Sequence, residues 1–395
     1  MEGHLSAPVW VTSGVPQGSV LGPLLFLVMM IDINDSIDQA MLGSFADDTK
    51  LWQMILLQLE LQEDLNRASQ WIHDNNMEVN GKKFDHLPIG PHRDTTYYTL
   101  DGQEIVTKEH VKDLGIQMSS TLKFDYHIIN MVGKADILSA WILRTFRTRD
   151  TYSLKTLLKS LLVPTAEYGS VLWSPDSQGL INLIESVQRK FTSRFAEFNE
   201  LDPETGLNKC VMQYWDRLKV LRVYSLERRR ERYIIIFMHK IILGIYPNPG
   251  FDPKDIAYDD RFESILIRPK HCPTAKPWVQ QIRYASFFHK GPKLYQTILP
   301  KIGGVQNILE PNKTNIDKFK EKLDDLLEFI PDEPGEKGCR NATTNSILDQ
   351  IHHLQEGPRR PKPKKKHLEN QPNQTANPNK KQKRRTHATN MPNCL

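Results

Sequence analysis

Two short segments decide how this sequence is interpreted: Ser13-Gly14-Val15-Pro16-Gln17-Gly18-Ser19-Val20-Leu21-Gly22-Pro23 and, further along, Phe45-Ala46-Asp47-Asp48. Glycine and proline make the first segment turn-rich, and it ends where Ser19 can cap a helix that has Pro23 in its first turn. The run from Leu24 to Ile31 continues this helix. Because the run is apolar on most faces, we expect the helix to be buried.

The second segment lies between two short arms, residues 41–46 and 49–52, and this pattern predicts a β-hairpin with Asp47 and Asp48 at its turn. Adjacent carboxylates repel each other unless they are exposed or share a cation. Mg²⁺ prefers hard oxygen ligands of this kind, so a solvated turn and a metal site are both open for the pair. The glycine-rich loop has a complementary use, because small residues let a template base and an incoming nucleotide approach the backbone closely.

The remaining sequence alternates short strands with amphipathic helices, so the predicted fold class is α+β. We expect hairpin strands around Asp101-Gly102 and one short strand over residues 111–116. A further helical stretch, dense in arginine, is expected over residues 215–242. Two further helices are marked by apolar stripes, one at Leu57, Leu61, Leu65, Ala68 and Ile72, the other at Leu180, Leu183, Ile184, Val187, Phe191 and Phe195.

The composition is that of a globular protein, with 395 residues, 39% hydrophobic residues and four cysteines that form no Cys-x-x-Cys pair. We therefore expect no disulfide scaffold or zinc knuckle, and no membrane span, because the longest apolar run is far shorter than ~20 residues. From Gly357 onward eleven Lys/Arg face one acid, Glu369, which gives +10; residues 1–356 carry −5. Residues 351–395 are predicted to be a disordered basic tail.

Together and in this order, the two segments resemble reverse transcriptases of non-long-terminal-repeat retrotransposons, the jockey-like group especially. The resemblance implies an RNA-directed DNA polymerase that uses two Mg²⁺ ions, an RNA template, a DNA primer and deoxynucleotides. Asp47 and Asp48 would be catalytic metal ligands, and Lys83 would be a general acid that protonates pyrophosphate. Contacts to template and nucleotide would come from Ser13, Gly14, Pro16, Gln17, Gly18 and Asn80.

Weaker matches extend the resemblance over roughly residues 10–350: residues 79–83, a primer-grip strand at 111–116, thumb segments at 167–173 and 187–189, and C-terminal segments at 217–233 and 331–334. They imply a partial palm with a small antiparallel sheet over 1–118, a thumb-like helical region over 119–200 and a C-terminal helical region over 201–350.

One departure concerns the family's first metal-ligating aspartate, which lies upstream of the glycine-rich loop. None of the twelve residues before Ser13 is an aspartate, so we expect weak metal binding and no activity from this chain alone. With the fingers missing, an exposed edge at Val9, Trp10 and Val11 would favour self-association. The alternative is a catalytically dead remnant that only binds nucleic acid.

Basic clusters leave further alternatives open. Arg228, Arg229, Arg230 and Arg232 could contact a nucleic-acid backbone, or they could form a solvated helix face paired with Glu227 and Glu231. The clusters at 362–366 and 380–385 could be a nuclear address, a nucleic-acid tether or a solvated tail. We expect a nuclear or cytoplasmic protein that is not secreted.

Overall fold

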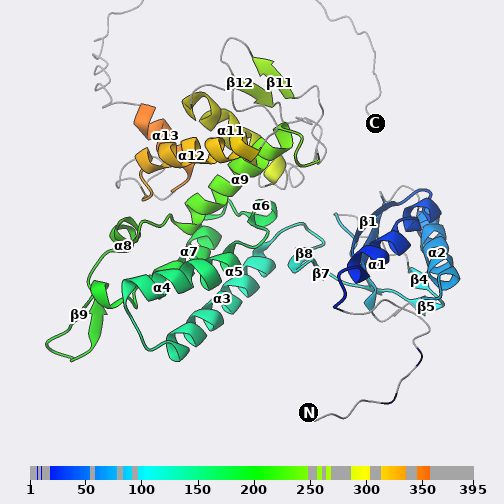
Figure 1. The fold of residues 1–395 in the computed structure, drawn as a ribbon, viewed down its shortest axis with the longest axis horizontal. Coiled ribbons are helices and arrows are strands. Elements are labelled where there is room, and N and C mark those ends of the chain that lie inside the picture. Colours follow the sequence, from blue (N-terminus) through cyan, green and yellow to red (C-terminus); the bar gives the residue numbers. More distant parts are fainter. Residues whose placement is uncertain are drawn as a thin grey trace, which may run out of the picture. The chain divides into compact units, whose positions relative to one another are not determined.

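The structure is a computed structural model that describes residues 7, 10, 18–53, 58–77, 83–90, 97–247, 256–259, 264–267, 286–302, 313–334 and 345–355. Figure 1 shows helices joined by short strands, as expected for an α+β chain. The strands in these ranges form six separate two-stranded ladders rather than one sheet. None of the helices in the same ranges is long and apolar enough to span a membrane.

The first part of the chain contains α1 (Gly22–Met30), a 3-10 turn (Ile33–Ser36), β1 (Met41–Phe45), β2 (Asp48–Trp52) and α2 (Gln58–Asp74). The β1–β2 hairpin is antiparallel, as predicted. β3 (Asp85–His86) pairs in parallel with β6 (Val106–Thr107), and β4 (Thr99–Leu100) pairs with β5 (Gln103–Glu104). A small core of Leu65, Tyr98, Leu100 and Ile105 holds these elements together.

A buried carboxylate on α2 fixes the segment that leads into β1. The Asp64 carboxylate accepts hydrogen bonds from the main-chain N–H groups of Asp38 (2.9 Å), Gln39 (2.9 Å) and Ala40 (2.7 Å), and it pairs with Arg67 at 2.7 Å. Burial raises the pKa of this carboxyl, but the three N–H donors and the guanidinium outweigh burial and hold the pKa below its usual value. Asp64 therefore positions the start of the hairpin.

Helix α1 forms as predicted, but its expected burial is wrong. Only Gly22 is buried, whereas Leu24, Leu25, Leu27 and Val28 are each more than half exposed. The described residues thus leave most of this apolar helix uncovered. Trp10, from the predicted exposed edge, is 94% exposed, and Val9 and Val11 lie outside the described residues.

The predicted single strand over 111–116 is also wrong, because it is a hairpin. β7 (His110–Asp113) pairs with β8 (Ile116–Ser119) through a connection made by Leu114 and Gly115, whose φ angles are 44° and 89°. Two positive φ values are what a tight hairpin connection of type I′ requires. The turn contacts a distant segment, since the Tyr168 hydroxyl donates to the Leu114 carbonyl at 2.9 Å.

From residue 125 onward the chain is mainly helical. α3 (Asp125–Thr145), α4 (Thr151–Leu157), a π-helical turn (Leu158–Leu162), α5 (Val163–Glu167), α6 (Ser170–Trp173) and α7 (Gln178–Thr192) share one core. β9 (Asn199–Leu201) and β10 (Asn208–Cys210) form a small hairpin before α8 (Tyr214–Leu221) and α9 (Leu226–Ile242).

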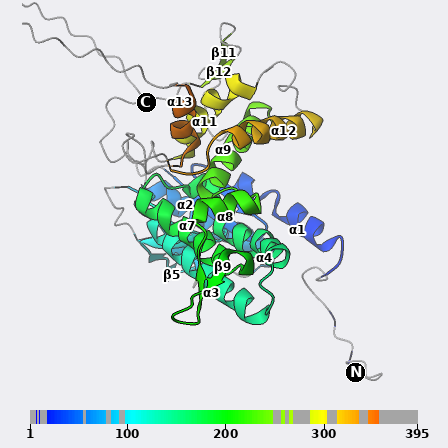
Figure 2. The same cartoon turned by 90° about the vertical axis from the view of Figure 1, so that its left-hand side faces the viewer.

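A second core surrounds the later part of α9. It contains residues of α11 (Phe287–Ile302), α12 (Lys313–Phe329) and α13 (Ile347–Gln355). A hairpin of β11 (Ile256–Asp259) and β12 (Ser264–Ile267) precedes α11. Both views show α9 running from the α3–α7 layer to the α11–α13 group, so it joins the two cores (Figure 1, Figure 2).

The helical stretch predicted over 215–242 consists of two helices, α8 and α9, with a break between them. Arg222 ends α8 with a φ of 48°, and Ser225 then begins α9 as its N-cap, accepting from the Arg228 N–H at 3.1 Å. Asp332 stabilises this break by accepting hydrogen bonds from the Ser225 N–H and hydroxyl, both at 2.7 Å. Tertiary contacts therefore override a helical pattern that is continuous in the sequence.

We predict that Asp64→Ala loosens the β1–β2 hairpin, because three main-chain N–H groups lose their acceptor. Local stability should fall by about 2–3 kcal/mol. Hydrogen exchange of the amides of residues 38–52 measures the change. Glu63→Ala, a change at an exposed position on the same helix, is the control and should leave exchange near the wild-type rate. Equal exchange in the two variants would show that Asp64 does not hold the hairpin.

Candidate active site

The candidate site is the connection between β1 and β2, where Asp47 and Asp48 lie side by side. Phe45 pairs with Asp48, so Ala46 and Asp47 form a two-residue connection, and Ala46 has a φ of 54° as such connections require. Both aspartates are exposed. The hairpin thus presents two adjacent carboxylates to solvent at one end.

Side chains along the hairpin brace this end. The Trp52 ring lies over Gly43, where even a Cβ atom would come within 2.8 Å of it, so only glycine fits this position without rearrangement. Ser44 and Thr49 face each other across the ladder, with their hydroxyl oxygens 3.3 Å apart. Lys50 reaches Asp113 at the end of β7, with Nζ 2.5 Å from the carboxylate. The two hairpins, β1–β2 and β7–β8, are therefore linked by an ion pair.

Most of the other predicted contacts to template and nucleotide lie outside the described residues. These are Ser13, Gly14, Pro16, Gln17 and Asn80. Gly18 is described and has a φ of 84°, a conformation that favours glycine. Lys83 is exposed, and within the described residues it forms no ion pair with Asp47 or Asp48. The described residues therefore do not decide whether all the predicted template and nucleotide contacts lie together with Asp47 and Asp48.

The donor type suits Mg²⁺, because both side chains offer hard carboxylate oxygens. However, the described part of the chain contains no group of three or more His, Cys, Asp or Glu residues that could hold a metal ion. Two carboxylates alone do not complete a site for two ions. The hairpin is therefore at most part of such a site.

The four arginines of α9 do not form a solvated face, and two of them cannot reach phosphate. Arg228 and Arg230 are only 0% and 1% exposed. The Arg228 guanidinium donates to the main-chain carbonyls of Ile330 and Pro331, at 3.2 and 2.7 Å. These two residues lie inside the protein, which argues against the expectation that they contact a nucleic-acid backbone.

Arg229 and Arg232 form bidentate ion pairs with carboxylates of other helices. Arg229 donates to both oxygens of Glu167 at the end of α5, at 2.6 and 3.0 Å. Arg232 donates to both oxygens of Asp324 on α12, at 2.5 and 2.6 Å. This geometry matches the planar guanidinium to a carboxylate. These arginines connect α9 to its neighbours.

Acidic side chains surround the first turn of α9. The buried Glu185 carboxylate accepts from the N–H groups of Leu226 (3.2 Å) and Glu227 (3.3 Å) and from the Tyr214 hydroxyl. An anion at a helix N-terminus is favourable, because the free N–H groups point towards it. Glu231 accepts from the Ser346 hydroxyl and the Ile347 N–H, at 2.7 and 2.6 Å, where α13 begins.

The buried Arg230 guanidinium offsets the charge of these acidic side chains. Burial lowers the pKa of its guanidinium, while the nearby carboxylates of Glu185 and Glu227 oppose that shift. Burial and the neighbouring Glu231 carboxylate raise the pKa of Glu227 to about 8, and the nearby Arg230 guanidinium opposes this shift only in part. Glu227 is therefore mostly protonated near neutral pH.

The first part of the chain is similar to known proteins. Residues 1–118 match the family described as reverse transcriptase (RNA-dependent DNA polymerase). This segment is similar to reverse transcriptases. The RNA-directed DNA polymerase from mobile element jockey of Drosophila melanogaster is 27% identical over 211 residues, which cover 50% of this chain and 23% of that protein. That alignment is longer than the family match, so the likeness continues beyond residue 118.

Two further relatives show the same extent. The probable RNA-directed DNA polymerase from transposon X-element of Drosophila melanogaster is 27% identical over 192 residues, covering 46% of this chain and 21% of that protein. An uncharacterized protein of Caenorhabditis elegans is 24% identical over 204 residues, covering 50% of this chain and 98% of that protein. The chain spans less than a quarter of both Drosophila polymerases. No solved structure matches the chain.

We predict that Glu227 makes the protein less stable as the pH rises from about 4.5 to about 8. In this interval the unfolded chain has lost the proton that the folded chain retains, so deprotonation favours unfolding. Glu227→Gln should remove up to about 1.4 kcal/mol of stability loss per pH unit. Urea unfolding at pH 6 and pH 8 measures this slope, and the exposed Glu197→Gln is the control. A slope unchanged by Glu227→Gln would contradict the assignment.

Proposed function

We propose that this chain carries the metal-binding hairpin of an RNA-directed DNA polymerase of a retrotransposon. The observation that supports it is the pair of adjacent, exposed carboxylates, Asp47 and Asp48, at a tight hairpin connection inside the segment that matches reverse transcriptases. The reaction of that class is attack of a primer 3′-hydroxyl on the α-phosphate of a deoxynucleotide, directed by an RNA template.

Each residue has a proposed role in this reaction. Asp47 and Asp48 would bind Mg²⁺, which supplies charge stabilisation for phosphoryl transfer. Lys83 would donate a proton to the departing pyrophosphate. Residues 13–18 and Asn80 would contact the template base and the incoming nucleotide, because a glycine-rich backbone lets them approach closely. In this reading residues 1–118 are a partial palm, residues 119–200 a thumb-like helical region and residues 201–350 a C-terminal helical region.

We also propose that the chain is inactive by itself. The described residues provide no cluster of three metal ligands, and a pair of carboxylates holds Mg²⁺ weakly because most of its octahedral shell stays water. A nucleotide would then be poorly placed for attack. Binding of metal and catalysis are therefore separable in this chain.

We expect weak Mn²⁺ binding at the hairpin, with a dissociation constant on the order of 1 mM. Mn²⁺ stands in for Mg²⁺, and electron paramagnetic resonance counts the free ion. The double variant Asp47→Asn, Asp48→Asn should lose one bound ion per chain. The matched control, Asp32→Asn with Asp35→Asn, changes two exposed aspartates of the preceding 3-10 turn and its cap and should not. Loss of equal amounts in both would show unspecific binding.

We expect no measurable primer extension by the purified chain with Mg²⁺, deoxynucleotides and a primed RNA template. The reason is the incomplete set of metal ligands. Incorporation of labelled deoxynucleotide measures the reaction, and a complete reverse transcriptase serves as the positive control. Robust extension that Asp47→Asn abolishes would overturn the proposed inactivity and establish a working enzyme.

A second candidate function is nucleic-acid binding without catalysis. The observations in its favour are the charge of +10 after Gly357 and the lack of a three-ligand cluster in the described residues. Polycations bind nucleic acid without sequence preference, because each neutralised phosphate releases a counterion.

We predict that deletion of residues 357–395 lowers both the affinity for a single-stranded RNA and the salt dependence of that affinity. Each lost phosphate contact should reduce the slope of log affinity against log salt by about 0.7. Fluorescence anisotropy at several salt concentrations measures both quantities. A chain of full length with Lys362, Lys364, Lys365 and Lys366 changed to glutamine separates charge from length. An unchanged slope after deletion would place the binding site in the body of the protein.

A further inference from the structure

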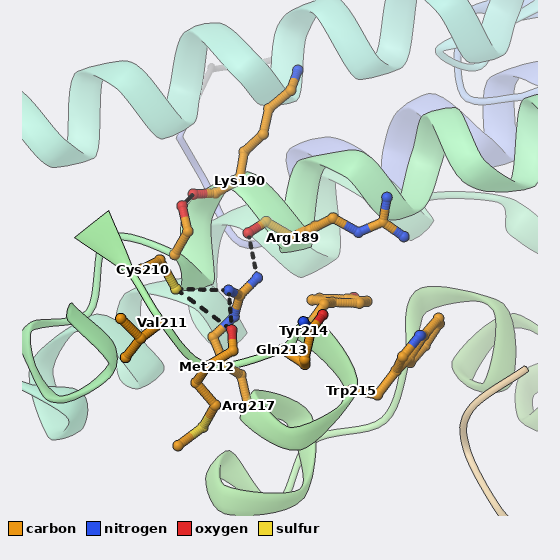
Figure 3. Close-up of a pocket in the computed structure, with 10 residues that line it drawn as sticks. Arg189, Lys190, Cys210, Val211, Met212, Gln213, Tyr214, Trp215 and Arg217 are labelled. Carbon is orange, nitrogen blue, oxygen red and sulfur yellow. Dashed lines mark hydrogen bonds between the residues drawn. The ribbon is translucent and has the colours of Figure 1, made fainter. Parts of the chain in front are cut away.

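A pocket of about 540 Å³ opens where the end of α7 meets the start of α8 (Figure 3). Its walls come from the last turn of α7, from residues 210–213 and from the first turns of α8. Neither the metal-binding hairpin nor the arginine contacts of α9 use these residues. The pocket therefore has no role in the functions proposed so far.

Three cations line this pocket. Arg189 and Lys190 come from α7 and are exposed, whereas Arg217 comes from α8 and is only 5% exposed. Arg217 donates to the carbonyls of Met212 and Arg189, at 3.0 and 3.1 Å, and its Nε atom has no hydrogen-bond partner. Lys190 pairs with Asp136 at 2.9 Å, which offsets one charge. The pocket keeps a net positive character that suits an anion.

Two aromatic rings complete the wall. The rings of Tyr214 and Trp215 have centroids 4.9 Å apart, and the Arg189 guanidinium lies 4.9 Å from the centre of the Tyr214 ring. Figure 3 shows the Arg189 side chain extended above Tyr214, with Trp215 beside it. Tyr214 is buried and tied to Glu185, while Trp215 is half-buried. The buried Tyr214 ring therefore supports the Arg189 guanidinium, and the neighbouring Trp215 indole is partly exposed to solvent.

We propose that this pocket binds one nucleotide of single-stranded nucleic acid, with its base stacked on Trp215 and its phosphate held by Arg189. Flat rings beside a guanidinium offer stacking surface to any base, and the cations match the phosphate. An acidic peptide would use the cations but not the aromatic faces. The assignment rests on the proposed function only in taking nucleic acid as the ligand, and it adds a binding site beyond the Asp47–Asp48 hairpin.

The first test locates the bound base on the full chain. The probe is a single-stranded ten-residue oligouridine that carries 5-iodouridine, which cross-links to aromatic side chains that lie against it. Mass spectrometry should find cross-links at Trp215. Cys210 lines the same pocket as a free thiol, so the oligonucleotide should also slow its alkylation. Cross-links confined to other segments, with unchanged alkylation of Cys210, would overturn the proposal.

The second test uses matched variants of the full chain. Trp215→Ala should reduce the protection of Cys210 by the oligonucleotide at least about fivefold, the loss expected for one stacked base. Arg189→Lys keeps the charge but loses the planar group and should have a smaller effect in the same direction. The control is Trp141→Ala, which removes an exposed indole from α3. An equal loss in the control and in Trp215→Ala would contradict the assignment.

Two further measurements separate this proposal from its alternatives. Polyglutamate of similar charge should protect Cys210 much less than the oligonucleotide; equal protection would make the pocket an unspecific anion site and end the proposal. The double variant Asp47→Asn, Asp48→Asn should leave the cross-link at Trp215 unchanged. If Mn²⁺ binding at the hairpin fails while this cross-link persists, the polymerase reading falls and the pocket stands. If Mn²⁺ binds at the hairpin but the cross-link at Trp215 is absent, only the proposal for the pocket is overturned.

Discussion

Buried charge is the constraint on which this structure depends most, because a charge removed from water must find a partner or be neutralised by gaining or losing a proton. Around the start of α9, Arg228 and Arg230 lie inside the protein and the carboxylates of Glu185, Glu231 and Asp332 accept main-chain N–H groups. Each of these contacts joins segments that are far apart in the sequence. The same ionic cluster therefore joins the two helical cores, and α9 contributes residues to both of them.

Segments that resembled the polymerase family prove to contact one another. The Leu114 carbonyl accepts a hydrogen bond from the Tyr168 hydroxyl, and the preceding residue, Glu167, accepts one from Arg229. Asp332 accepts a hydrogen bond from the Ser225 hydroxyl at the start of α9. None of these contacts reaches the Asp47–Asp48 connection. They form a structural chain from the β7–β8 hairpin to the helices. Accordingly, the chemistry proposed for this protein depends on few residues, while most of the motif residues that are described maintain the fold.

Local pattern predicted the β1–β2 hairpin, α2 and α7 well, since turn residues and apolar spacing act over short distances. It failed where distant partners decide the outcome. The arginines of α9 follow a surface-like pattern, and their acceptors at Glu167, Asp324 and Pro331 are invisible locally. Asp64 was missed as a positioning residue, although its place on the apolar stripe with Leu61, Leu65 and Ala68 was a usable signal. Helix α1 shows the converse, because its apolar sequence predicted burial that the described residues do not provide.

We propose that Asp47 and Asp48 bind a divalent cation at the hairpin, and the position of that ion can be measured directly. Replacement of Mg²⁺ by Fe²⁺, followed by ascorbate and peroxide, generates hydroxyl radicals that cut the backbone beside the bound ion. Mass spectrometry of the fragments then gives the position of the cuts. We expect cuts near residues 45–49 that disappear when both aspartates become asparagine. Cuts elsewhere in the chain, or cuts at the hairpin that persist in that variant, would contradict it.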